Sequence, residues 1–131
     1  MAELRRAAIN RHKQHVANVH RNYGRDIGLV SKRGTNRLRY APTDTLLKSL
    51  VLANVTTRME YKEFLCRLFK RYGLIFGERE AEVVIPKEDF EKKAFQANSR
   101  RLEQRLSSLG MLRRLSDACA YVQNPLAREQ R

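Results

Sequence analysis

The chain of 131 residues contains no tryptophan, three prolines and only two cysteines, and these scarcities exclude several classes of protein. Cys66 and Cys119 have no further cysteine at metal-binding spacing, so neither a disulfide framework nor a zinc finger is expected. Both are expected to be small buried side chains in a reducing compartment. Long apolar runs are also missing, which predicts neither a membrane span nor a signal peptide. These absences favour a cytoplasmic or nucleoid-associated protein.

Negative charge is scarce as well. The chain has 14 acidic residues against 27 lysines and arginines, which gives a formal net charge of +13. A field of that sign attracts polyanions and releases counterions when the protein docks on them. Residues 1–42 hold ten of the cations against Glu3 and Asp26 alone. Nucleic acid is therefore the first partner expected, and a solvated basic arm or an arm that docks on an acidic protein is the alternative.

Groups that could support catalysis or bind a metal are few. His12 and His15 stand three apart on a predicted helix, but no carboxylate or cysteine nearby completes a ligand set. The acidic-x-Lys element at 89–93 fits the first turn of a helix better than a nuclease site, because acidic residues favour a helix N-terminus. The sequence has no catalytic triad arrangement and no phosphate-binding glycine loop. We therefore predict no catalytic residue, no metal site, no cofactor and no enzymatic activity.

What the chain does contain is one pattern that occurs twice. A basic helix leads into a Gly-apolar-apolar strand, a turn, and a second strand that contains a tyrosine and is followed by a proline. The first copy covers residues 28–42 and the second covers residues 110–125. A helix followed by a basic two-stranded ribbon is a shape that fits nucleic acid.

Apolar spacing and turn residues predict the remaining elements. Five stretches have helical spacing: 3–22, 43–55, 60–72, 78–82 and 88–109. Gly24 and Gly73 are the expected C-terminal stops, and Asn98-Ser99 is an optional break. Hairpins are expected at 27–40 and 111–123. The sequence thus predicts a mainly α fold with small β-hairpins, in which the second and third helices supply most of the core.

Residues 98–112 carry a resemblance to a known fold. Their sequence is NSRRLEQRLSSLGML. It resembles the winged helix-turn-helix superfamily, in which a recognition helix ends in Leu-Gly-apolar-apolar and enters the wing. The resemblance covers residues 43–126, whereas residues 3–42 resemble only the last helix and wing. It implies a partial unit at 1–42, a winged-helix-like domain at 43–126 and a tail at 127–131.

The chain departs from the winged-helix pattern between Gly73 and Phe90, where it is longer than a usual helix-helix turn. Members of the superfamily occur in DNA-binding regulators. They also serve as scaffolding pieces in larger nucleic-acid machines, including prokaryotic defence complexes. The resemblance therefore implies either a DNA-binding or a scaffolding role.

Within the winged-helix interpretation, two groups of polar residues are placed to contact nucleic acid. The predicted recognition helix and second hairpin supply Asn98, Ser99, Arg101, Gln104, Arg105, Arg113 and Arg114. The first hairpin supplies Lys32, Arg33, Arg37 and Arg39, which suit phosphate contact. The alternative is a solvated helix face with local pairs to Glu103, and a charged edge hairpin that prevents aggregation.

The sequence therefore predicts a non-enzymatic nucleic-acid-binding protein, with duplex DNA favoured over RNA. Two alternatives stay open. The chain could be a protein-interaction subunit of a larger complex, with the acidic stretch 78–82 and the apolar residues 74–76 as contact surface. It could also bind structured RNA or the ribosome. A homodimer stays open, and no membrane partner is expected.

Overall fold

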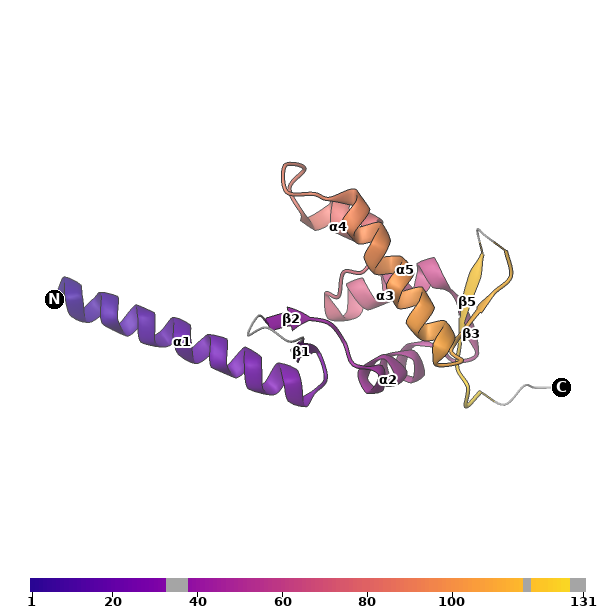
Figure 1. The fold of residues 1–131 in the computed structure, drawn as a ribbon, viewed down its shortest axis with the longest axis horizontal. Coiled ribbons are helices and arrows are strands. Elements are labelled where there is room, and N and C mark those ends of the chain that lie inside the picture. The colour runs from indigo at the N-terminus through magenta and orange to yellow at the C-terminus, as the bar shows by residue number, and fades with distance from the viewer. Residues whose placement is uncertain (33–37, 117–118, 128–131) are drawn as a thin grey trace. The chain divides into compact units, whose positions relative to one another are not determined.

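The structure, a computed structural model, describes residues 1–32, 38–116 and 119–127. It is mainly helical with short antiparallel strands, which confirms the predicted fold class (Figure 1). The chain divides into two compact units, Met1–Leu46 and Leu47–Arg131, and each is described by itself. Cys66 and Cys119 are free thiols, as expected, but each is only half-buried.

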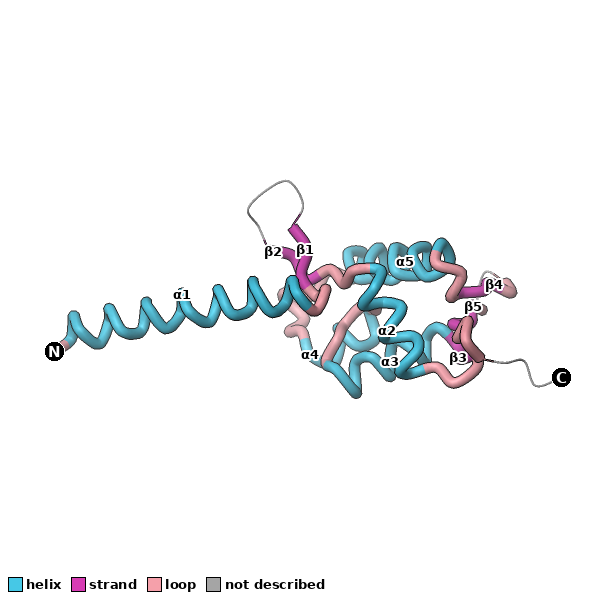
Figure 2. The backbone as a smooth tube through the Cα atoms, turned by 90° about the horizontal axis from the view of Figure 1, so that it is seen from below, coloured by secondary structure: helices cyan, strands magenta, loops and turns pink. Residues whose placement is uncertain are grey.

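The first unit consists of one long helix and a hairpin. The helix α1 (Ala2–Asp26) has 25 residues, and the hairpin pairs β1 (Val30–Lys32) with β2 (Leu38–Tyr40) beside the C-terminal end of α1 (Figure 2). The prediction that Gly24 ends the helix was wrong. Gly24 is buried inside α1, because Val30 packs so closely that a Cβ at position 24 would lie 2.7 Å from Val30 Cγ2.

The two copies of the sequence pattern have the same geometry where helix turns into ribbon. Gly28 and Gly110 both adopt left-handed backbone conformations, with φ of 76° and 70°. In the first copy the amides of residues 28 and 29 donate to the carbonyls of residues 25 and 24. In the second copy the amides of residues 110 and 111 donate to the carbonyls of residues 107 and 106. Each glycine therefore ends its helix in the same hydrogen-bonded turn.

The second unit alternates helices with short strands. Its elements, of which the first begins in the preceding unit, are α2 (Asp44–Asn54), β3 (Arg58–Glu60), α3 (Tyr61–Tyr72), α4 (Glu78–Val84), α5 (Lys92–Ser108), β4 (Leu112–Arg114) and β5 (Ala120–Gln123). The strand β5 lies between β3 and β4, and both pairings are antiparallel. In register, Val122 stands opposite Met59 on one side and Leu112 on the other.

The core of the second unit is built by α2, α3, α5 and one face of the sheet. The largest fully buried side chains are Phe64, Leu47, Leu68, Leu106, Val51, Val55 and Val122. The prediction that residues 44–55 and 60–72 supply most of the core agrees with this set. Because apolar residues recur every three or four positions along α3, one side of that helix is covered while the other stays charged.

The helix α5 differs from the prediction in two respects. It begins at Lys92 rather than near residue 88, and it runs through Asn98 and Ser99 without a break. Ser99 therefore does not cap a new helix, and Tyr61 of α3 donates a hydrogen bond of 2.7 Å to the Ser99 carbonyl. That contact pins the middle of α5 to the core.

Candidate nucleic-acid interface

One face of α5 is polar and exposed along its length. Asn98, Arg101 and Gln104 are exposed and follow one another at three-residue steps, which keeps them on the same side of the helix. Leu102 and Leu106, on the adjoining apolar side of the helix, are buried in the core. Arg105 lies on the polar side but is half-buried. The structure therefore brings these predicted site residues together on one surface.

Ser99 is an exception, and the expectation that it faces outward was wrong. Its side chain is half-buried, and its Oγ lies 3.3 Å from Tyr61 Oη. Burial is the main cause that raises the pKa of the Tyr61 phenol. The hydrogen bond with Ser99 lowers this pKa, and the nearby Glu103 and Glu80 carboxylates raise it further. Tyr61 is therefore a neutral donor that fixes the rotation of α5 about its axis.

The outer face of the three-stranded sheet carries a second basic group. The Arg58 guanidinium lies 5.9 Å from the ring centroid of Tyr121, and Arg113 pairs directly with Tyr121 in the strand register. Alternation along the strands places Met59, Leu112 and Val122 on the other, buried face. The resulting surface combines two exposed arginines with one aromatic ring, and Glu60 and Gln123 share it.

Arg58 was missed by the sequence analysis, because Arg58-Met59-Glu60 has a single apolar residue and no strand pattern. The only local signal is the alternation of the apolar Met59 with two charged neighbours. That signal is too short to distinguish a strand from a turn.

Arg114 is engaged within the unit. Its Nε and Nη2 donate to Glu103 Oε1 at 3.1 and 2.8 Å. The Glu103 side chain is only 16% exposed, so this ion pair is better shielded from water than an ordinary surface pair. The pair ties β4 to α5 and thereby fixes the ribbon relative to the polar face of the helix.

In the first unit the structure describes only some of the predicted residues. Arg39, in the middle of β2, is exposed and stands opposite Ser31 in the register. Lys32 is the last residue of β1. Arg33 and Arg37 lie outside the described residues.

A model of the family of methylation-associated defense system protein MAD7 matches residues 1–124. The chain belongs to this family. The matched span takes in both units, and the polar face of α5 and the basic face of the sheet lie wholly inside it. No curated protein and no solved structure matches the chain.

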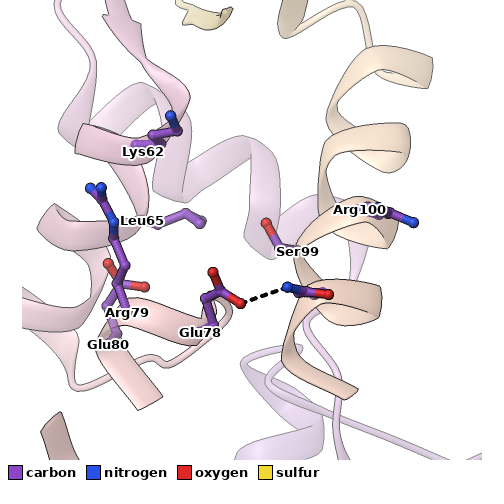
Figure 3. A pocket seen from close by; sticks show the side chains of 9 residues that line it. Lys62, Leu65, Glu78, Arg79, Glu80, Ser99 and Arg100 are labelled. Atoms are coloured by element: carbon purple, nitrogen blue, oxygen red, sulfur yellow. Dashed lines mark hydrogen bonds between the residues drawn. The ribbon is translucent and has the colours of Figure 1, made fainter. Parts of the chain in front are cut away.

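This MAD7-family chain also has a pocket of about 300 Å³ between α3, α4 and the first half of α5 (Figure 3). It is lined by Lys62, Leu65, Gly77, Glu78, Arg79, Glu80, Gln96, Ser99 and Arg100. Glu78 points toward α5, where it accepts a hydrogen bond of 2.8 Å from Gln96 and pairs with Lys92 at 3.7 Å. The pocket thus mixes both charge signs and uses Glu78 to join α4 to α5.

Two negative findings apply to the described part of this MAD7-family chain. No group of three histidine, cysteine or acidic side chains among residues 1–32, 38–116 and 119–127 could hold a metal ion. Within the same ranges, no helix has the length and apolar content that crossing a bilayer requires.

Proposed function

We propose that this chain is a non-enzymatic component of a methylation-associated defence system and that it binds duplex DNA. The observation that carries the proposal is the exposed face of α5, where Asn98, Arg101 and Gln104 lie together. Arginine can bond guanine bidentately in the major groove, and asparagine or glutamine can bond adenine in the same way. The face therefore offers the chemical groups for direct reading of base edges.

The arrangement of the second unit supports a winged-helix assignment. The order α2, β3, α3, α5, β4, β5, with β5 as the central strand, places a helix immediately before a two-stranded ribbon. In this interpretation α5 is the recognition helix, β4 and β5 form the wing, and α4 is an addition that lengthens the connection between α3 and α5. The two contacts made by Tyr61 and Glu103 then hold helix and wing in a fixed relation.

The basic face of the sheet would supply affinity rather than sequence preference. Arg58 and Arg113 flank Tyr121 on an exposed surface, and each arginine that neutralises a phosphate releases condensed counterions. Because these contacts are electrostatic, binding should weaken steeply as salt rises.

A binding role without catalysis is supported by the pocket near α4. Its carboxylate Glu78 is already engaged by Gln96 and Lys92. A carboxylate engaged in this way is not free to act as a general acid or base.

The experiment is a titration of a fluorescent mixed-sequence duplex at salt concentrations from about 50 to 200 mM. We expect Arg101→Ala with Arg113→Ala to weaken binding at least about tenfold and to lower the salt slope by about two. The matched control is Lys48→Ala with Lys70→Ala, which removes two exposed cations from α2 and α3. An equal loss of DNA affinity in both double variants would contradict the proposal, as would an affinity that does not change with salt. Tighter binding of a structured RNA than of the duplex would show that the ligand is RNA.

A further inference from the structure

The helix α1 carries apolar side chains that nothing else in the described part of the first unit covers. Every residue from Met1 to Tyr23 is exposed, and Gly24 is the one buried residue of the helix. Ile9 is 47% exposed and Tyr23 is 64% exposed. The described residues of the hairpin lie beside the C-terminal end of α1, where Tyr40 Oη lies 3.4 Å from His20 Nδ1.

These side chains have the spacing of a coiled-coil seam. Ile9, Val16 and Tyr23 are seven residues apart, and His12 and Val19 fall between them at alternating steps of three and four. This is the a and d pattern of a heptad repeat, which packs against a second helix. His12 is the one polar member between Ile9 and Tyr23, and it occupies a d position.

The stability of α1 also requires a cover. Helix nucleation is costly, so intrinsic propensity alone seldom accounts for the stability of a helix in a protein. The free energy that stabilises most protein helices comes from burying one apolar face. An uncovered seam of this length therefore indicates that α1 buries it on a binding partner.

The charges beside the seam identify the partner. One flank carries Arg6, Lys13 and His20, and the other carries Ala8, His15 and Asn22, so neither flank holds an acidic residue. In a pair of α1 helices, cations would therefore meet only cations or neutral groups. A nucleic acid would satisfy the cations but leave the apolar seam unburied, whereas an amphipathic helix with acidic flanks satisfies both.

We propose that α1 pairs with a helix of another protein of the defence system, one whose apolar heptad seam is flanked by aspartate or glutamate. The pairing uses the first unit and does not depend on the proposed DNA site on α5. It gives the chain a second function as an adaptor, in which a partner protein is attached through α1.

The chemistry of the pairing is tested with the full chain and two synthetic peptides. Both peptides have Ile and Leu at a and d over four heptads, and they carry Glu or Lys at e and g. We expect the Glu peptide to bind and the Lys peptide to bind at least about tenfold more weakly. Val16→Asp should weaken binding of the Glu peptide at least about tenfold, because it places a charge in the seam. The control Gln14→Asp makes the same charge change on the opposite side and should have an effect below about threefold.

The identity of the partner is tested by a photo-crosslinking residue placed at position 16 or at position 14 of the full chain, in cells that contain the whole defence system. We expect position 16 to crosslink to one segment of another system protein, with apolar heptads and acidic flanks, and position 14 to do so far less. Crosslinks from position 16 to a second copy, to residues 47–131 of the same chain or to nucleic acid would overturn the proposal, as would equal labelling from both positions. The double variant Arg101→Ala, Arg113→Ala should retain the crosslink. A failure of the DNA proposal can therefore be distinguished from a failure of the α1 proposal.

Discussion

At Gly110 the backbone conformation alone restricts which residue can occupy the position. Its φ is 70°, and a Cβ built there would meet no atom within 4 Å. The cost of a side chain at this position is therefore conformational strain without a clash. Gly28 is different, because a Cβ at that position would overlap the Thr43 hydroxyl as well.

We predict that Gly110→Ala lowers the free energy of unfolding by about 1–2 kcal/mol, because L-alanine is strained in the left-handed region. Gly110→Asn should recover a large part of that loss, since asparagine tolerates this conformation. Urea denaturation of the three proteins measures both effects. Equal stability of the alanine and glycine proteins would show that the turn is not held in this conformation.

Tyr61 makes the stability of the protein depend on alkaline pH. Burial raises the pKa of its phenol above the ordinary value of about 10, so the folded state holds the proton more tightly than the unfolded state. The stabilisation is complete below about pH 10 and is lost as pH rises from there through the folded pKa.

We predict that Tyr61→Phe costs about 1 kcal/mol at neutral pH, because the hydrogen bond to the Ser99 carbonyl is lost. Above about pH 10 only the tyrosine protein should lose stability, by up to about 1.4 kcal/mol for each pH unit, so its advantage should fall to about zero near pH 11 and then reverse. Denaturation curves recorded at several values between about pH 7 and pH 11 give the difference. A difference that stays constant across this range would refute the linkage.

Among the elements, α2 ends in a network supplied by α3. The last turn of α2 has no basic residue of its own. Arg67 donates to the Asn54 carbonyl at 2.9 Å, and Arg71 donates to Asn54 Oδ1 at 3.3 Å. The amide nitrogen of Asn54 in turn donates to the Leu50 carbonyl at 2.7 Å. Cations from α3 thus satisfy the carbonyl end of α2 and complement its dipole.

We expect Asn54→Ala to destabilise the protein by about 1–3 kcal/mol, because it removes the hydrogen bonds of a buried amide side chain to the Leu50 carbonyl and to Arg71. Glu63→Ala is the comparison, since it removes only the exposed ion pair with Arg67 and should cost about 0.5 kcal/mol or less. Thermal or urea unfolding measures both. A cost for Glu63→Ala as large as that for Asn54→Ala would contradict the assignment of the network to Asn54.

Local sequence patterns were sufficient for some elements and not for others. The helix α3 was predicted closely because its apolar residues recur at helical spacing and Gly73 follows with a left-handed backbone. The strand β3 was not predicted, because it exists only by pairing with β5, far along the chain. Gly24 was predicted to end α1 because glycine commonly follows the last turn of a helix. Its close contact with Val30 explains instead why a glycine lies inside the helix.

The residues of the candidate site also differ in how well the sequence predicted their positions. Helical periodicity placed Asn98, Arg101 and Gln104 on one exposed face, and the structure agrees. Ser99 was misplaced, because its partner Tyr61 is 38 residues away and has no local signature. Arg114 was predicted to contact nucleic acid, and its pair with Glu103 between β4 and α5 was not predicted. Whether the exposed face binds DNA stays a prediction.

At the scale of the whole molecule, the two units should differ in local stability. The helix α1 buries only Gly24, whereas α3 buries four large side chains in the core. Amide hydrogen exchange follows the free energy of local opening, which is low where few apolar contacts are buried.

We predict that amides in residues 6–22 exchange at least about 100-fold faster than those in the middle of α3. Mass spectrometry of the exchanging full chain resolves the two helices. Addition of the Glu heptad peptide should slow exchange in α1 and leave α3 unchanged. Protection of α1 equal to that of α3 in the free chain would show that α1 is already covered.

The position of β5 in the sheet bears on how the protein is made. The ribosome releases β5 after β3 and β4, yet β5 is the strand that joins them. Until Val122 has emerged, Met59 and Leu112 lack the neighbour that covers both of them. The second unit can therefore close only after β5 has emerged, when α1 has been outside the ribosome for about a hundred residues of chain growth. The exposed face of α1 is therefore presented on the nascent chain before the core beneath α5 is complete.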